Sequence, residues 1–411
     1  MLTLGIKTMK QQKFPQEFIA AWPDQRLDAM RAAGDPLADA TVAAIFAAGD
    51  RELVNKIMPL LHNPESWPPE TPPQLATYLA LSQQLPAWAD PVILQRAYQF
   101  LAVQAVPYNI ILLYLSLPIM NAWQTGGSQT LALTGQLTQY FARRLSETLR
   151  FVRAVIAEQG MSENGNGIRT TQKVRLMHAT IRHYAQSAQC PSDRGYWNPA
   201  WGKPINQEAL TATMLAFSTV AVGGLRKFDI HVTEQEESDL LHLWKVIGTI
   251  LGVDAANMPA TVKEADLLWK KFAQRNFGAS PAGKMLTQAH IDFMRNIVKG
   301  DELLHRELAK SDDALLRYLL GYKVAVDMLG VKRPGIAGLI VIFMRDLLGL
   351  ADVIVELDKS LQDWLTENAE GILKKLQEFW DHFDGSRPFH IPSTKDGEGG
   401  LARACAMEEA A

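Results

Sequence analysis

The sequence predicts an all-α protein. Three observations lead to this prediction: Leu, Ala, Gln, Glu and Arg dominate the composition, strand-like alternation is scarce, and clusters of Gly and Pro separate long helical stretches. With 47% hydrophobic and 21% charged residues, a chain of 411 residues can bury a large core. No stretch is typical of a flexible interdomain linker. We therefore expect one helical domain over 1–385 and a loose C-terminal tail over 386–411.

The first half of the chain divides at its turn-forming residues. Asp35 followed by Pro36 is typical of a helix start, because aspartate caps an N-terminus and proline fits the first helical position. The predicted elements are a helical pair at 15–62, a proline-rich connector at 63–73, helices at 74–84 and 90–121, a turn at 125–129, a long helix at 130–159 and a loop at 160–171.

The second half continues in the same way. Thr233 followed by Glu236 forms a capping-box pattern and predicts a helix start there. The predicted elements are a helix containing "KVRLMHATIRHY" (173–184), a loop with two tryptophans at 190–204, helical segments at 205–228 and 233–253, and amphipathic helices over 260–380.

Two apolar stretches, 105–123 and 335–350, are the candidates for membrane contact. Pro107 and Pro118 interrupt the first, charged residues break the second, and both are short for a bilayer span of about 20 residues. We expect buried helices and no transmembrane segment. The second stretch is also compatible with peripheral membrane contact.

The charge and the cysteines bear on partners and compartment. A net charge of −3 argues against a general nucleic-acid binder, which normally shows a concentrated basic face. Two cysteines, Cys190 and Cys405, cannot make a disulfide framework, which favours a reducing compartment. The N-terminal segment carries no secretory signal pattern. These features predict a cytoplasmic protein, while a homo-oligomer stays open.

The chain offers few motifs that carry chemistry. None of its nine histidines forms HExxH, HxH or a Cys/His zinc pattern, and no P-loop, Rossmann or nucleophile-elbow motif occurs in a suitable setting. Two helical patterns remain. In the first, His178 falls in one apolar stripe with Val174, Met177 and Ile181. Such a histidine is either a structural core residue or a ligand, and a neutral imidazole suits a haem iron.

The second pattern is "FARRLSETLRFVRAV" (141–155), in which Arg144 and Thr148 lie one turn apart on an apolar face. A buried guanidinium needs an anionic partner. That partner is either a core carboxylate or a haem propionate, which arginine binds with two parallel hydrogen bonds.

Several of these segments together resemble the catalytic domain shared by the latex clearing proteins, which are rubber oxygenases, and the MpaB-type oxygenases. The resemblance covers roughly 35–255. Its motifs are, in order, "LPAWADP" (85–91), "RRLSET" (143–148), "KVRLMHATIRHY" (173–184), "WGKPINQEALTATMLAFSTVAVGGLRKF" (201–228) and "LLHLWKVIGTILGV" (240–253).

The resemblance implies a globin-like helical domain around a non-covalent b-type haem, and an enzyme that uses dioxygen to cleave C=C bonds of isoprenoid chains. It assigns the proximal iron ligand to His178, and it places Arg144 and Thr148 at the haem edge or the distal site. Arg182 is then a cofactor-binding candidate, with His183 and Gln207 as further groups behind the ligand. The absence of a C-x-x-C-H motif agrees with non-covalent haem.

Two departures from the family pattern bear on the reaction. The family's glutamate after a proline is Ile119 here, following Pro118, and the family's lysine between the arginine and the threonine is Glu147. A lysine that caps the distal iron position in the closed state would correspond to Lys56 or His62.

Three functions therefore stay open from the sequence. The first is a haem b oxygenase that acts on dioxygen and a small hydrophobic, isoprenoid-like substrate. The second is a haem-dependent oxidase, peroxidase or dehydrogenase without C=C cleavage. The third is a non-enzymatic helical protein in which His178 and Arg144 are structural.

Overall fold

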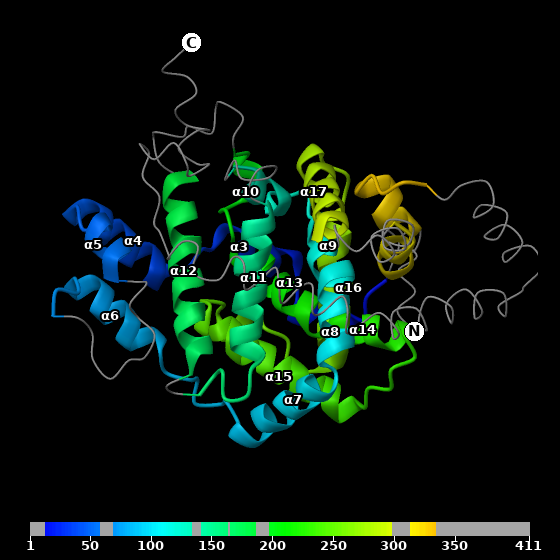
Figure 1. Cartoon of the computed structure of the whole chain (residues 1–411), viewed down its shortest axis with the longest axis horizontal. Helices are drawn as coiled ribbons and strands as arrows, with labels where there is room; N and C mark the ends of the chain where they lie inside the picture. Colours follow the sequence, from blue (N-terminus) through cyan, green and yellow to red (C-terminus); the bar gives the residue numbers. More distant parts are fainter. Residues whose placement is uncertain are drawn as a thin grey trace, which may run out of the picture.

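The computed structural model describes residues 13–57, 69–133, 141–162, 165–185, 197–297 and 313–333 (Figure 1). Every named element within these ranges is a helix, and an isolated bridge between Trp123 and Phe277 is the extent of β pairing there. The predicted all-α class is confirmed. Cys190, Cys405 and the tail at 386–411 lie outside the described residues, as does the apolar stretch at 335–350.

The elements of the first half are short helices. They are α2 (Gln16–Ala21), α3 (Asp24–Ala32), α4 (Pro36–Ala48), α5 (Arg51–Ile57), α6 (Pro73–Ser82), α7 (Pro91–Val103), α8 (Ala105–Ile111), the π-helix η2 (Leu112–Ser116), α9 (Leu117–Met120) and α10 (Gly127–Leu133).

The second half contains the longer helices. They are α11 (Phe141–Ile156), α12 (Asn166–Ala185), α13 (Gln207–Phe217), α14 (Thr219–Lys227), α15 (Glu234–Ile250), α16 (Val262–Asn276) and α17 (Pro281–Ile297). Short turns are η4 (Pro199–Trp201) and η5 (Ala255–Asn257), and η6 (Lys323–Met328) is a second π-helix.

Side-chain caps fix the helix starts that the sequence indicated. The Asp35 carboxylate accepts a hydrogen bond from the Ala38 N–H at the start of α4. Thr233 and Glu236 form the complete capping box of α15. Each cap satisfies N–H groups that have no partner inside the helix.

Several predicted boundaries differ from the structure. The helical pair expected at 15–62 is described as α2, α3, α4 and α5, and the turn expected at 125–129 is helical from Gly127. The long helix expected at 130–159 is described as α10 and α11, with 134–140 outside the described residues. The loop expected at 160–171 is shorter, because α12 already begins at Asn166. The reason lies at Gly167, where a Cβ would come within 2.5 Å of the Gly160 carbonyl oxygen. That glycine permits a close backbone approach within a helix and does not end one.

The apolar stretch at 105–123 lies inside the fold, as predicted, and Ile111 and Ile119 have no exposed surface. Among the described residues, one segment, Gln207–Lys227, is long and apolar enough to cross a membrane, and 89% of its apolar window is buried within the protein. A bent pair, Pro91–Val103 with Ala105–Met120, passes the same test only if both parts count together. This finding is weak support for a span, because core helices pass the same test.

Four helices frame the interior of the molecule. Helices α11 and α12 pack side by side as a hairpin, and α4 packs on the other flank of α12 (Figure 1). Helix α13 packs against α9, α15 and α16 in the middle of the fold. This arrangement places the histidine-bearing helix between the small N-terminal helices and the central core.

A buried histidine on α17 makes stability depend on pH. His290 is 3% exposed, and its burial lowers its pKa to about 4, while a hydrogen bond with the Leu113 backbone opposes that shift. In the unfolded chain the His290 imidazole takes up a proton below about pH 6.5. In the folded chain it stays neutral down to about pH 4. Stability therefore falls with decreasing pH, by about 2 kcal/mol between pH 7 and pH 5 from this group. Urea unfolding of a His290→Gln variant should show a pH slope reduced by this amount, and an unchanged slope would contradict the assignment.

Candidate functional site

A cavity of about 330 Å³ lies between α9, α10, α11, α12 and α13. Its wall is mainly apolar, and the polar side chains on it are few. The lining residues are Leu117, Met120, Asn121, Trp123, Thr125, Gly126, Gly127, Thr130, Glu147, Thr148, Phe151, Val174, Met177, His178, Ile181, Trp197, Ile205, Asn206, Ala209, Leu210, Thr213, Met214, Phe217 and Leu251.

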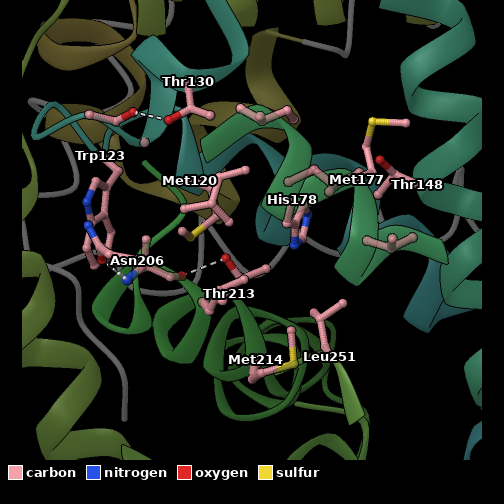
Figure 2. Close-up of a pocket in the computed structure, with 18 of the residues that line it drawn as sticks. Met120, Trp123, Thr130, Thr148, Met177, His178, Asn206, Thr213, Met214 and Leu251 are labelled. Atoms are coloured by element: carbon pink, nitrogen blue, oxygen red, sulfur yellow. Dashed lines mark hydrogen bonds between the residues drawn. The ribbon is translucent and has the colours of Figure 1, made fainter. Parts of the chain in front are cut away.

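The apolar stripe predicted on α12 forms one wall of this cavity. Val174, Met177, His178 and Ile181 all line it, so the i, i+3, i+4, i+7 spacing identified the correct face. His178 is half-buried, and in Figure 2 its imidazole points into the space bounded on other sides by Met120 and Thr213. A single imidazole thus faces a mainly apolar interior.

Helix α11 supplies the neighbouring wall. Thr148 and Phe151 line the cavity, and so does Glu147, whose side chain is largely exposed to solvent. Thr148 and His178 both line the cavity, so the structure brings the predicted threonine and histidine to one site (Figure 2). Arg144 lies on α11 one turn before Thr148. The structure describes its backbone but not its side chain.

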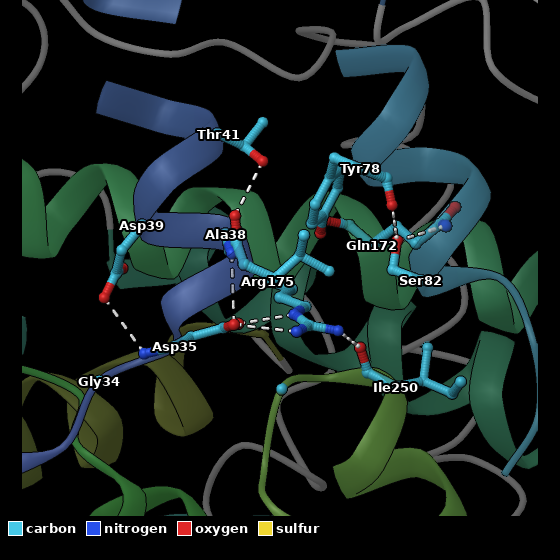
Figure 3. Close-up of polar contacts among 12 residues, drawn as sticks. Gly34, Asp35, Ala38, Asp39, Thr41, Tyr78, Ser82, Gln172, Arg175 and Ile250 are labelled. Atoms are coloured by element: carbon cyan, nitrogen blue, oxygen red, sulfur yellow. Dashed lines mark hydrogen bonds and ion pairs between the residues drawn. The ribbon is translucent and has the colours of Figure 1, made fainter. Parts of the chain in front are cut away.

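The adjacent face of α12 is anchored by a buried ion pair (Figure 3). The Arg175 guanidinium binds the Asp35 carboxylate with two hydrogen bonds of 2.6 and 2.9 Å, and it also donates to the Ile250 carbonyl at 3.1 Å. Burial alone would lower the pKa of Arg175, but the hydrogen bonds and charge of Asp35 raise it. This one side chain therefore ties α12 to the start of α4 and to the end of α15.

Arg182 anchors the same helix seven residues later. It is 2% exposed, donates from Nε to Asp39 at 2.6 Å and donates from Nη1 to the Ile205 carbonyl at 3.1 Å. Arg182 does not line the cavity; Ile205, which it holds, does. The predicted contact of Arg182 with a cofactor stays a prediction, whereas its role in fixing the cavity wall follows from these bonds.

Ile205 adopts a strained backbone at the cavity wall. Its φ is +49°, a left-handed value that β-branched residues rarely adopt. Because alanine pays the same Cβ penalty and glycine does not, we expect Ile205→Gly to be more stable than Ile205→Ala by about 1 kcal/mol. At Ala209, inside α13, glycine in place of the native alanine should instead cost about 1 kcal/mol. Thermal unfolding of the three variants measures both differences in stability. Backbone strain at Ile205 would be contradicted if Ile205→Gly were no more stable than Ile205→Ala.

Two tryptophans close the end of the cavity near α10. A Cβ at Gly126 would lie 2.7 Å from the Trp197 ring, and one at Gly127 would lie 2.9 Å from the Trp123 ring. The glycines therefore permit the indoles to cover this turn. The sequence analysis identified Trp197 as a loop tryptophan but could not predict its contact with Gly126. The two residues lie far apart in the chain, and only the fold brings them together.

The other predicted residues lie elsewhere. Lys56 is exposed on α5 and is not among the cavity residues, and His62 lies outside the described residues. His183 stacks on Phe46 with ring centroids 4.6 Å apart, toward α4. Gln207 bonds the Gly34 and Gly252 carbonyls, and its role is to join loops behind the wall. Ile119 is fully buried.

Comparison with known families decides the identity. Residues 110–351 match the family described as "ER-bound oxygenase mpaB/B'/Rubber oxygenase, catalytic domain", which is more than half of the chain. The chain belongs to this family. It is therefore an enzyme of an oxygenase family, and the non-enzymatic alternative is wrong. Relative to the expected span of about 35–255, the match begins and ends later in the chain.

A solved structure agrees with the family. The chain is similar to the structure of latex clearing protein in the closed state, with a TM-score of 0.69 and 22% sequence identity, over 88% of this chain and 95% of that one. At this identity the likeness shows the shared helical fold. No curated protein matches the chain.

Proposed function

We propose that this rubber-oxygenase relative is a haem b-dependent oxygenase that cleaves a C=C bond in a small, hydrophobic, isoprenoid-like substrate. The observation that carries the proposal is the position of His178. It is an imidazole on the apolar wall of a cavity, within the fold of this oxygenase family.

The side chains around the cavity suit a haem. A porphyrin is large and apolar, so a haem would be held by apolar walls and by a side-chain donor to its iron. His178 would be that donor, and Met177, Leu210 and Phe217 would be among the walls. Within the described residues no group of three or more His, Cys, Asp or Glu could hold a bare metal ion. Thr148 would contact the haem or its ligand, and Arg144 would be the partner of a propionate.

When bound, the haem would supply the activation of dioxygen. The protein contributes orientation and exclusion of water. The Asp35–Arg175 and Asp39–Arg182 pairs fix α12 on its outer side, and thereby hold His178 in place. Met120 and Met214 can adjust their shape to an irregular apolar chain, because an unbranched thioether has several accessible rotamers.

The proposed reaction inserts both atoms of one dioxygen molecule. The C=C bond breaks, each of its carbons becomes a carbonyl carbon, and no external reductant is consumed. A haem-dependent oxidase, peroxidase or dehydrogenase is the second candidate. The observation that favours it is Ile119, which places an alkyl group where the family carries a carboxylate.

An absorption spectrum of freshly purified protein, with and without dithionite and carbon monoxide, tests the cofactor. We expect a Soret band that shifts with both reagents, and a protein that stays without one after hemin is added would refute the proposal. Oxygen uptake and product masses with isoprenoid alkenes separate the two candidates. Two added oxygen atoms with a shortened chain support cleavage.

We also propose that the protein is cytoplasmic, and cell fractionation tests this location.

A further inference from the structure

We infer that the thioether of Met120 binds the haem iron on the side opposite His178 when no substrate is present. The inference rests on the proposed function, since it takes a haem held by His178 as given. It names a group for the distal position, which the sequence analysis left to Lys56 or His62. Lys56 is exposed on α5 and does not line the cavity, so the fold places its side chain elsewhere.

Met120 lies across the cavity from the histidine. It is the last residue of α9, it lines the cavity, and it is half-buried. In Figure 2 the Met120 side chain and the His178 imidazole lie on opposite sides of the open interior, one from α9 and the other from α12. The wall that carries Met120 would therefore face the iron from the side opposite His178.

The neighbours of Met120 fix its backbone. Ile119 has no exposed surface, and Trp123 is 2% exposed and donates its backbone N–H to the Met120 carbonyl at 3.1 Å. The Asn121 side chain donates from Nδ2 to Thr287 Oγ1 at 3.2 Å. The backbone is therefore anchored in the core, while the unbranched side chain keeps several accessible rotamers. Such a thioether can bind an iron and can also withdraw from it.

The other candidate ligands on the wall are placed differently. Proteins bind haem iron mainly through histidine, cysteine, methionine or tyrosine. Among the described residues that line the cavity, these types are His178, Met120, Met177 and Met214. Met177 directly precedes His178 on α12 and so belongs to the histidine's own wall. Met214 is fully buried, and its sulfur faces α15, 3.3 Å from where a Cβ at Gly248 would lie. Met120 is thus the thioether of the opposite wall.

The segment that carries Met120 is also where the chain departs from the family's carboxylate. Ile119 occupies that place and is not among the cavity residues, whereas Met120 is. This segment therefore brings a soft sulfur to the cavity in place of an oxygen anion. A methionine opposite a histidine raises the reduction potential of a haem. Met120 would thereby favour the ferrous state and would leave the iron when dioxygen or carbon monoxide competes for it.

Spectroscopy of the purified holoprotein and of a Met120→Leu variant tests the inference, because leucine has nearly the volume of methionine but no donor atom. Electron paramagnetic resonance should show low-spin ferric haem in the parent and high-spin haem in the variant. The midpoint potential of the variant should be lower. The ferrous variant should bind carbon monoxide at least about threefold more tightly, because no side chain then competes for the iron.

Met30→Leu is the matched control, because Met30 is a buried methionine of α3 that does not line the cavity. It should leave the spin state and the potential unchanged. Near-infrared magnetic circular dichroism of the parent protein identifies the group opposite His178, since a thioether gives a band distinct from that of an amine or a second imidazole. This measurement needs no variant, so it decides the question even if Met120→Leu folds poorly.

A Met120→Leu protein with the parent's spin state, potential and carbon monoxide affinity would overturn the inference. So would an amine or imidazole band in the parent, or a low-spin state that His62→Ala removes and Met120→Leu does not. Each of these outcomes requires a haem-loaded protein, so each refutes this inference and leaves the proposed cofactor in place. A protein that takes up no haem refutes the proposed function itself.

Discussion

On the proposed function, a His178→Ala variant should purify without a Soret band from cells in which the parent protein takes up haem. Loss of an iron–imidazole bond weakens haem binding by at least on the order of 100-fold, since even groups that merely support such a ligand contribute 10–100-fold. Alanine is also the best helix former, so α12 should persist. Absorption spectra at equal protein concentration give the haem content, and circular dichroism confirms the helical fold.

His183→Ala is the matched control for this experiment. His183 lies on the same helix five residues later, but it stacks on Phe46 of α4 and is not among the cavity residues. Its variant should therefore keep the band. Free imidazole added to the His178→Ala protein should restore part of the Soret absorption, because it can occupy the space that the side chain leaves. A His178→Ala protein with the parent's band would show that another group binds the iron.

Much of the fold follows from local patterns. The capped starts at Asp35 and Thr233 and the apolar face with His178 depend on residues a few positions apart, and all three agree with the structure. The sequence also singled out Thr148, because the i, i+4 spacing placed it on an apolar face of its helix. Such features can be predicted because helix geometry alone determines them.

The parts that could not be predicted depend on contacts distant in sequence. Nothing near Arg182 indicates that its partners are Asp39 and the Ile205 carbonyl, so its proximity to His178 suggested a cofactor contact. The sequence likewise identified Glu147 only as a departure from the family. Its place on the cavity wall follows from the packing of α11 against α12, which no local pattern encodes.

Removing the charge of Asp35 should be the most destabilising single change on the outer side of α12. An Asp35→Asn variant keeps the α4 cap, because asparagine caps as well as aspartate, but it leaves the Arg175 guanidinium buried and without its counter-charge. We expect a loss of about 3–5 kcal/mol in the free energy of unfolding, measured by denaturant titration. Asp35→Ala should cost about 1 kcal/mol more, since it also removes the cap.

Two comparisons decide whether the buried ion pair is the cause. Adding Arg175→Met to Asp35→Asn should recover part of the loss, because no unpaired charge then remains buried. In the Arg96–Asp239 pair, whose arginine side chain is 42% exposed, Asp239→Asn leaves a guanidinium that water can still solvate, and it should cost no more than about 1 kcal/mol. Equal losses at the two pairs would contradict the argument.

Gly252 gives an independent way to disturb the same ion pair without removing a charge. Its φ is +99°, and a Cβ there would lie 2.2 Å from Asp35 Oδ2 and 2.8 Å from Arg175 Nε. Gly252→Ala must therefore displace the two groups, and it should lower stability by more than the roughly 1 kcal/mol of backbone strain alone. Because Arg175 precedes His178 by one turn, the same variant should also lower haem retention. A variant that is destabilised yet retains haem fully would show that the outer face of α12 stabilises the fold without positioning the histidine.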